Sequence, residues 1–481
     1  MLQKISLAAR VRDIFCVDLR SLAIFRMAIA MIILADLIAR SLSLEAHYAD
    51  FGVLPRAIFI EKFSPPFRFS LHFLSGDPYF QLGLFILAGI FACMLLVGLY
   101  TRMATLLSWF FMISLHARNP LVLQGGDLLL RMVLFWSIFL PLGAKWSFDS
   151  HKAGARRIIS NSYLSLANVA YFVQIAFVYW STAAEKLSPR SFSIWWEQGS
   201  AIYYALNIDQ FATPLAIFIR QFPLLMKIMN YAVIVFEIVG PLLFFSPIAT
   251  GTMRTLAVVT FISLHIGFGS CLVLGPFPWV GAAAMLPFIP TCVWGKISFV
   301  KKTQTATQPL SLSVPSSPLT DNLVGICLIY ITFWNIGNLY PSLGVPRLFH
   351  EMGNLISLDQ RWHMFSPPLR EDGWYVVPGT LKNGEKVDLI KDGAPVDWEK
   401  PALLSRQLKT ERWRKYMMNL WIKKHAGHRA LYAAYLCRNW NRKHIGNQEL
   451  EEVEIVYMRE TTYPDFIEKP QKISLLKYAC Q

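Results

Sequence analysis

Long apolar runs, separated by short polar loops, fill the first 340 residues of the chain. An α-helix needs about 20 mostly apolar residues to cross the hydrocarbon core of a bilayer, and about nine runs approach that length. They lie at residues 20–43, 78–99, 103–117, 125–143, 163–187, 224–245, 254–274, 277–294 and 321–340, of which the third and the eighth are short. The pattern predicts an α-helical polytopic membrane protein with about nine transmembrane helices.

After residue 340 charged residues become dense, and no further apolar run reaches the length of a span. Trp374–Ile390 is typical of a β-hairpin, because Asn383-Gly384, a pair that favours positive φ, separates two strand-like runs. The pattern next predicts a turn at Asp392-Gly393, helices at about 403–424 and 428–443 with Gly427 between them, and a last strand, Val453–Arg459, before a polar tail. Residues 341–481 are therefore expected to form one α+β domain.

The composition agrees with a membrane protein. Only 16% of the 481 residues are charged, against about 25% in soluble proteins, and 54% are hydrophobic. These values exclude a disordered chain, a coiled coil and a disulfide-stapled secreted domain. A net charge of +15 would suggest nucleic acid in a soluble protein, but in a membrane protein it indicates basic cytoplasmic loops. We therefore expect a lipid bilayer, and no nucleic acid, as partner.

The orientation follows from basic residues in loops that share one side of a nine-span topology. They are Lys4, Arg10, Arg12 and Arg20 at the start, Lys145, Lys152, Arg156 and Arg157 after the fourth span, and Lys296, Lys301 and Lys302 after the eighth. The positive-inside rule then predicts a cytoplasmic segment 1–19, a transmembrane domain 20–340 and an extracytoplasmic domain 341–481. The Ser/Thr/Pro-rich stretch 303–319 would be a cytoplasmic linker.

Two further features concern processing and redox state. The first span carries Arg26 and Asp36 and has no small-residue cleavage site, so it is expected to stay as an uncleaved anchor. Cys437 and Cys480 would both lie in an oxidising space, where they could pair. The alternative is that Cys480 is simply a tail residue.

Charged side chains inside a bilayer cost about 2.5–3.5 kcal/mol each, so they are usually paired or functional. The expected spans contain many ionisable residues: Arg26, Asp36, Arg40, His116, Asp127, Arg131, Glu185, Lys186, Glu237 and His265. Asp36 with Arg40, and Asp127 with Arg131, stand four residues apart on one helix face, which favours local ion pairs. Arg26 and Glu237 have no partner nearby in sequence. An ion pair between these two residues, across helices, is one option.

Most of these residues share the outer half of the membrane in the nine-span topology; Arg26 does not, and Glu237 lies near the middle. Ion pairs that serve only packing would not need to share a side. A polar cavity that opens outward would produce this distribution.

Lys186 is the sharpest catalytic candidate, because it follows the aromatic run FVYWSTAAEK at the outer end of the fifth span. Burial disfavours the charged form of a lysine, and a neutral lysine can act as a general base or nucleophile. The alternative is a lysine that reaches from a helix end to the interface, which is common. The chain has no glycine-rich phosphate loop, CxxC, HExxH or GxSxG motif, and its histidines lack metal-ligand spacing, so no metal site is expected.

Four segments together carry a family resemblance. They are DLRSLAIFRMAIAMIILADLIAR with YADFGVLPR, the turn GLYTR, LHARNPLVLQGGDLLLR, and AAEKL with WWEQGSAIYYAL. Over roughly residues 18–294 the chain resembles the HTTM superfamily, the membrane domain shared with vitamin K-dependent γ-carboxylase. The later DQRWHMFSPPLREDGWYVV and YLCRNWN are similar to the outer tail of bacterial members, which implies the inner (plasma) membrane.

The resemblance implies a chemistry. In the carboxylase a lysine deprotonates a reduced quinone, oxygen converts the quinol to a strong base, and that base prepares a glutamate side chain for carboxylation. Lys186 matches that lysine, and Glu237 falls near an acidic position of the family. A reduced quinone of the menaquinone or vitamin K type is the implied cofactor, and a secreted or periplasmic peptide the implied partner.

One position departs from the family pattern. The carboxylase has a histidine after its third span that supports the lysine, where this sequence has Pro120. Lys186 would then need another partner, such as His116 or Glu185, while His265 is a further candidate in the seventh span.

Three functions follow from these observations. The first is a quinol- or lipid-using enzyme of the carboxylase or epoxidase kind, with Lys186 as base in an outward-facing cavity. The second is a non-catalytic membrane factor for maturation or export of a secreted partner. A transporter ranks last, because no internal repeat is evident.

Overall fold

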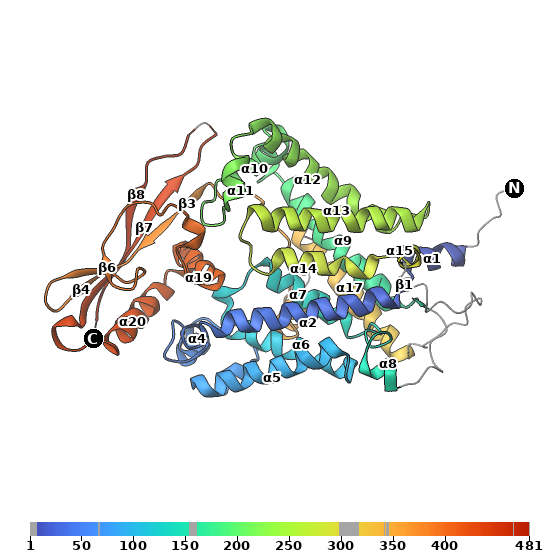
Figure 1. Ribbon diagram of the computed structural model, residues 1–481, viewed down its shortest axis with the longest axis horizontal. Coiled ribbons are helices and arrows are strands. Elements are labelled where there is room, and N and C mark those ends of the chain that lie inside the picture. Colours follow the sequence, from blue (N-terminus) through green and yellow to red (C-terminus); the bar gives the residue numbers. More distant parts are fainter. Residues whose placement is uncertain are drawn as a thin grey trace.

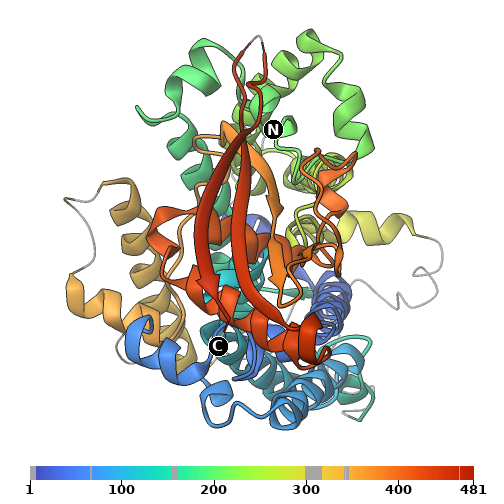
Figure 2. The ribbon, with the colours of Figure 1, turned by 90° about the vertical axis from the view of Figure 1, so that its left-hand side faces the viewer.

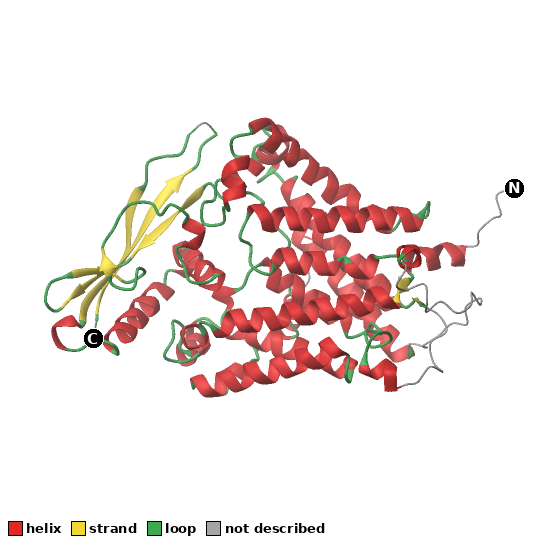
Figure 3. Cartoon of the chain, in the orientation of Figure 1, coloured by secondary structure: helices red, strands yellow, loops and turns green. Residues whose placement is uncertain are grey.

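The computed structural model describes residues 7–65, 68–152, 161–297, 317–340, 342, 346–464 and 466–480. These residues form a helical bundle with a β-sheet unit at one end (Figure 1). Figure 3 shows the separation clearly, because the longer strands all gather in the unit at the left of the view.

The bundle contains both long and short helices. Its α-helices are α1 (Leu7–Phe15), α2 (Leu19–Ser41), α3 (Leu44–Tyr48), α4 (Arg56–Lys62), α5 (Pro78–Val97), α6 (Thr101–Arg118), α7 (Gly125–Ser137), α8 (Phe148–Lys152), α9 (Leu166–Lys186), α10 (Ala201–Leu206), α11 (Pro214–Ile219), α12 (Pro223–Phe244), α13 (Thr250–Cys271), α14 (Phe277–Ala284), α15 (Thr291–Lys296), α17 (Pro318–Leu339) and α18 (Arg347–Leu355). Shorter helical turns are η1 (Leu71–Phe73), η2 (Pro120–Val122), η3 (Ser193–Glu197) and η4 (Leu286–Phe288), and β1 (Val17–Asp18) pairs with β2 (Ser162–Tyr163).

Six of the described helices are long and apolar enough to cross a membrane, namely α2, α5, α9, α12, α13 and α17. Each of the nine predicted runs contains helix, so the prediction of a helical polytopic membrane protein is confirmed at that level. The other three runs correspond to α6, α7 and the α14–α15 region. Since α7 has 13 residues, it is roughly 20 Å long, which is shorter than the hydrocarbon core.

The long helices begin where their sequences supply caps. Asp77 accepts a hydrogen bond from the backbone N–H of Phe80, and Pro78 occupies the first turn of α5, where a missing N–H costs nothing. Ser317 caps α17 in the same way through the N–H of Thr320. Of the predicted linker 303–319, residues 303–316 lie outside the described residues.

The outer unit, residues 371–480, is a six-stranded antiparallel sheet with two helices against it. Its strands are β3 (Glu371–Val376), β4 (Pro378–Leu381), β5 (Lys386–Asp388), β6 (Ala394–Pro395), β7 (Leu450–Thr461) and β8 (Gln471–Ala479), and its helices are α19 (Glu411–Trp421) and α20 (His428–Asn441), with turns η6 (Leu404–Arg406), η7 (Lys423–His425) and η8 (Gly446–Gln448). β7 is central: β3 and β4 lie end to end along one edge of it, and β8 pairs with the other edge. Figure 2 shows this sheet lying across the end of the bundle.

The predicted hairpin is partly confirmed. Asn383-Gly384 does form the turn between β4 and β5, with Gly384 at φ 83°, and Asp392-Gly393 forms the next turn, with both residues at positive φ. However, Trp374–Val376 belong to β3 and pair with β7 rather than with β5. The reason is that β5 has only three residues. It can pair only with β4, which is the second half of the strand that was expected to begin at Trp374.

Two other predictions in this unit were wrong in part. The helix expected from residue 403 begins only at Glu411, where the side chain of Thr410 caps it through the N–H of Trp413. The expected polar tail is strand β8, which pairs with β7 from Glu452↔Ala479 to Arg459↔Gln471. Alternation of lysines with apolar residues in QKISLLKYA suits a half-exposed strand.

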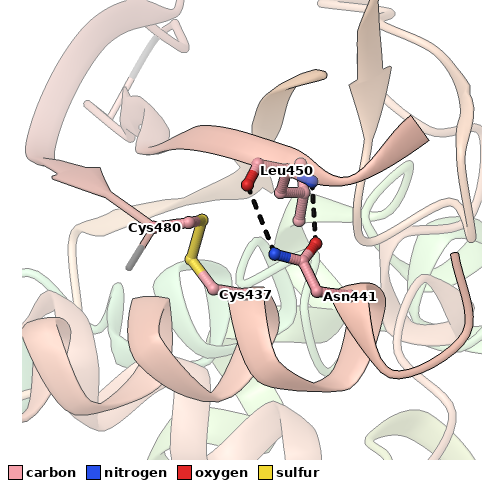
Figure 4. Close-up of a disulfide and its surroundings, with 4 residues drawn as sticks. All are labelled: Cys437, Asn441, Leu450 and Cys480. Atoms are coloured by element: carbon pink, nitrogen blue, oxygen red, sulfur yellow. Dashed lines mark hydrogen bonds between the residues drawn. A yellow bond between two sulfur atoms is a disulfide. The ribbon is translucent and has the colours of Figure 1, made fainter. Parts of the chain in front are cut away.

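A disulfide joins Cys437 of α20 to Cys480, which follows β8 (Figure 4). Asn441, one turn further along α20, exchanges two hydrogen bonds with the backbone of Leu450 at the start of β7. Helix α20 is therefore fixed to the sheet at two neighbouring places, and the option in which the cysteines pair is the one observed.

The outer unit and the bundle share one hydrophobic core at their junction. Val53, Leu54 and Phe59 around α3 and α4 pack in the same buried cluster as Tyr416 and Leu420 of α19. The sheet unit is therefore built onto the helices rather than suspended from a linker.

Candidate functional site

Lys186, at the last turn of α9, is enclosed. Its side chain is 4% exposed, and its Nζ donates a hydrogen bond to Oε1 of Glu237, which lies in the middle of α12. The same nitrogen lies 4.6 Å from the centre of the Trp195 ring of η3. The amine thus lies between a carboxylate from a helix 51 residues further along the chain and an aromatic face from the turn that follows α9.

Glu237 is the partner that the sequence did not reveal. It was expected to be unpaired or to contact Arg26, but Arg26 donates to the backbone carbonyls of Leu142 and Trp146, at 3.3 Å and 2.5 Å. The second carboxylate oxygen of Glu237, Oε2, is buried and has no hydrogen-bond partner among the described residues. The pair therefore keeps one free acceptor.

Tyr179 and His265 form a second contact between α9 and α13. The Tyr179 hydroxyl lies 2.8 Å from Nε2 of His265, and both side chains are buried. Tyr179 precedes Lys186 by seven residues, so it lies two turns earlier on the same side of α9. His265 is thus held on the side of α9 that carries the lysine.

Neither of the two partners expected for Lys186 contacts it. His116 lies with its Nε2 3.7 Å from Asp127, and Glu185 lies 3.7 Å from Arg361. Pro120, the position that departs from the family pattern, belongs to η2 beside α19.

Asp36 and Asp127 form a buried ion-pair cluster with two arginines. Arg40 binds Asp36 at 2.7 Å and Asp127 at 2.5 Å, while Arg412 of α19 binds Asp36 at 2.5 Å and Asp127 at 2.6 Å. The predicted Asp36–Arg40 pair is therefore present. The predicted Asp127–Arg131 pair is replaced, because Arg131 turns to Asp359 at 3.2 Å.

Arg412 is the functional-looking residue that sequence reasoning missed. It belongs to the basic stretch 412–415, a pattern that by itself is typical of a solvated helix face, yet its side chain is 1% exposed. In the sequence Asp36 and Asp127 each have an arginine four residues away, so the charges balance locally and no signal points to Arg412.

Asp36, His116 and Asp127 place three possible metal ligands within 4.8 Å of one another. The carboxylate oxygens already accept hydrogen bonds from Arg40 and Arg412. Two guanidinium groups thus supply the positive charge that a metal ion would supply, and the arrangement is best described as an ion-pair cluster.

A polar cavity lies where the bundle meets the outer unit, and most of the ionisable residues singled out from the sequence do not line it. It has a volume of about 440 Å³, and its lining includes His116, Asp127 and Arg131. Lys186 and Glu237 lie outside its lining, so the predicted site residues divide into two groups: the cavity with its ion-pair cluster, and the enclosed lysine.

Comparison with protein-family models, with curated proteins and with solved structures finds no match to the chain. The structure shows a helical protein with several helices that fit a lipid bilayer, and an α+β unit at one end of the helical bundle. A conclusion about function therefore depends on the geometry of the residues described above.

Proposed function

We propose that the protein is an integral membrane enzyme of the kind that the vitamin K-dependent γ-carboxylase resemblance implies, with Lys186 as its general base. The observation that carries the proposal is the enclosed Lys186–Glu237 pair against Trp195. A buried ion pair is expensive and gives little stability in return, so its presence at the family's lysine position favours a chemical role.

The chemistry of this chain's residues is a proton transfer. A bound reduced quinone supplies an acidic hydroxyl and a centre that reacts with oxygen. Lys186 can accept a proton only when its amine is neutral, and the hydrogen bond to Glu237 gives the ammonium proton a direct acceptor at Oε1. Glu237 thus holds the proton that leaves the ammonium group of Lys186.

Access to the amine depends on Trp195. Its ring covers Nζ, and its indole N–H donates to the backbone carbonyl of Phe365 at 2.8 Å. In this proposal the bond to Phe365 holds the ring over the amine, so the segment that precedes the outer unit helps to control access to the lysine.

A lateral groove of about 670 Å³ suits an apolar chain such as a quinone tail. Its walls are formed by α2, α13 and α14, with Ile32, Ile262 and Trp279 among the lining residues, and Asp36 and Glu411 supply its charged groups. Ile262 lies one turn from His265, so the groove runs beside the helix that contacts α9.

The proposal includes nine spans in the inner (plasma) membrane, a cytoplasmic N-terminus and an outer domain outside the cell membrane. Two observations support this orientation. The Cys437–Cys480 disulfide suits an oxidising compartment. In addition, α1, α8 and α15, which carry or adjoin the basic loops, lie at the end of the bundle away from the sheet (Figure 1).

The test uses Lys186→Ala, Lys186→Arg and Glu237→Gln in the full chain in membranes. Carboxylation of a glutamate-containing peptide and epoxidation are assayed with reduced menaquinone or reduced vitamin K. We expect Lys186→Ala to lose at least a hundredfold in rate, as is typical when a general base is removed.

Lys227→Ala, which removes an exposed lysine from the same helix as Glu237, is the matched control and should keep full activity. Turnover that is equal in Lys186→Ala and the parent, or undetectable in the parent, contradicts the proposal.

One observation favours the second candidate, a non-catalytic factor for a secreted partner. Within the described chain β8 pairs only with β7, which leaves its outer edge open to an added strand. This alternative expects maturation of the partner to survive Lys186→Ala and to fail when the hairpin around Asn383-Gly384 is deleted.

A further inference from the structure

We propose that the 440 Å³ cavity between the bundle and the outer unit binds a phosphate group, either that of an anionic lipid or a free phosphate. The cavity lies between η2, α7 and α19, and the segment 359–364 forms another part of its wall. This inference does not depend on the chemistry of Lys186, which lies outside the cavity lining.

The lining is rich in cations. Arg68, Arg131, Arg361 and Lys415 all border the cavity, against the carboxylates Asp127 and Asp359. Asp127 is already compensated by Arg40 and Arg412, which stand behind the wall. The cavity therefore has a net positive charge, and this charge attracts an anion.

Two buried nitrogens in this wall make no hydrogen bond to any residue that the structure describes. His116 is 3% exposed as a residue, and its Nε2 makes no hydrogen bond within the described residues; Nε of Arg131, whose side chain is 10% exposed, makes none either. Unpaired buried polar groups are rare in native structures and call for a partner. Donors in the wall of a cationic cavity can be satisfied by an oxyanion.

Two more cations in the wall are free to reach a ligand. No ion pair or side-chain hydrogen bond of Lys415 or Arg68 is found in the described ranges, and both side chains are only partly exposed. Lysine and arginine side chains that are not used in the fold can converge on one anion at little cost to stability.

The geometry favours phosphate over carboxylate. A carboxylate offers two oxygens, whereas four cations and the imidazoles of His116 and His363 border this cavity, and a phosphate has three or four oxygens to share among them. The cavity lies at the end of the bundle where the helices meet the outer unit, which is the level of headgroups in the proposed orientation.

The experiment compares two sources of phosphate on the purified full chain. In one arm, native mass spectrometry counts phosphatidylglycerol retained by protein from phosphatidylcholine nanodiscs doped with that lipid. In the other, isothermal titration with inorganic phosphate is performed in an uncharged detergent. The pocket variant is Arg68→Gln with Lys415→Gln, and the control is Lys62→Gln with Arg190→Gln, which removes the same charge from exposed positions.

We expect at least one arm to show binding that the pocket variant weakens tenfold or more and the control changes less than twofold. Binding in the lipid arm alone identifies a lipid headgroup, and binding in both identifies a site for phosphate as such. The proposal is overturned if neither probe binds, if pocket and control variants weaken equally, or if acetate competes as well as phosphate at equal ionic strength. If the double variant does not fold, Lys415→Gln alone decides, because Lys415 makes no ion pair in the described chain.

Discussion

Asp372 is a carboxyl group that the fold keeps away from water. It lies in β3, is 5% exposed, and accepts a hydrogen bond from the backbone N–H of Gln210, which belongs to the loop between α10 and α11. Burial, with a smaller contribution from the neighbouring Asp209, raises the pKa of Asp372 to about 7, although backbone hydrogen bonds oppose the shift. The group therefore titrates near neutrality, at the contact between bundle and outer unit.

The raised pKa predicts a pH-dependent stability. Between pH 4 and pH 7 the folded chain keeps the Asp372 proton while the unfolded chain has lost it, so the free energy of unfolding falls as pH rises. The loss is on the order of 4 kcal/mol over the whole interval and is complete above pH 7. Asp372→Asn should flatten the pH dependence of the melting temperature between pH 5 and pH 8.

Asp392→Asn is the matched control, since Asp392 is exposed at a turn. Its melting curve should follow the parent at every pH. An Asp372→Asn protein with the parent's pH slope would show that the carboxyl is not protonated in the fold.

The local rule for ion pairs at four-residue spacing succeeded at Asp36–Arg40 and failed at Asp127–Arg131 for a physical reason. A pair on one exposed helix face is worth a few tenths of a kcal/mol. Any closer cation from another element outcompetes it, and Arg40 and Arg412 both reach Asp127. The spacing of residues in the sequence does not identify ion-pair partners that come from distant elements, such as Glu237 for Lys186.

At the scale of elements, helices were the most predictable part. Apolar runs of about 20 residues specify membrane helices without tertiary information, and all nine runs contain helix. Strands were harder, because β8 and the split between β3 and β4 depend on pairing with β7. Asn383-Gly384 and Asp392-Gly393 were found because turn geometry is a local property.

The contact between α13 and α14 depends on Gly281. A Cβ at this position would lie 2.1 Å from Cε1 of His265, so Gly281→Ala must displace the imidazole from Tyr179. Such overpacking costs about 1–3 kcal/mol. We expect a lower melting temperature for Gly281→Ala in detergent.

Gly267→Ala on α13 is the control, because a Cβ there would meet no described atom within 4 Å. Alanine in an open helix position should leave the melting temperature unchanged or raise it. Equal effects of the two substitutions would mean that helix propensity, not the His265 contact, sets the outcome.

At the scale of the whole molecule, Arg412 connects the outer unit to the bundle through buried ion pairs. It comes from α19 and reaches Asp36 of α2 and Asp127 of α7, so one guanidinium compensates two carboxylates from different helices. Arg412 also donates to the backbone carbonyl of Val122 at 3.0 Å.

Arg412→Ala should destabilise the protein by about 3–5 kcal/mol, because it leaves buried carboxylates short of a cation. The measurement is thermal unfolding of the full chain in detergent. Arg442→Ala, which breaks an exposed pair with Glu45, should cost less than about 1 kcal/mol. A small effect for both would mean that Arg40 alone suffices for Asp36 and Asp127.

The position of β8 has a consequence for biosynthesis. The central strand β7 has an open edge until residues 471–479 have been made, and the crosslink at Cys480 forms later still. In the proposed orientation these residues must also cross the membrane before the sheet can close. The sheet of the outer unit therefore cannot close until residues 471–480 have left the ribosome, and a chain truncated before residue 471 would present an unpaired strand to chaperones and proteases.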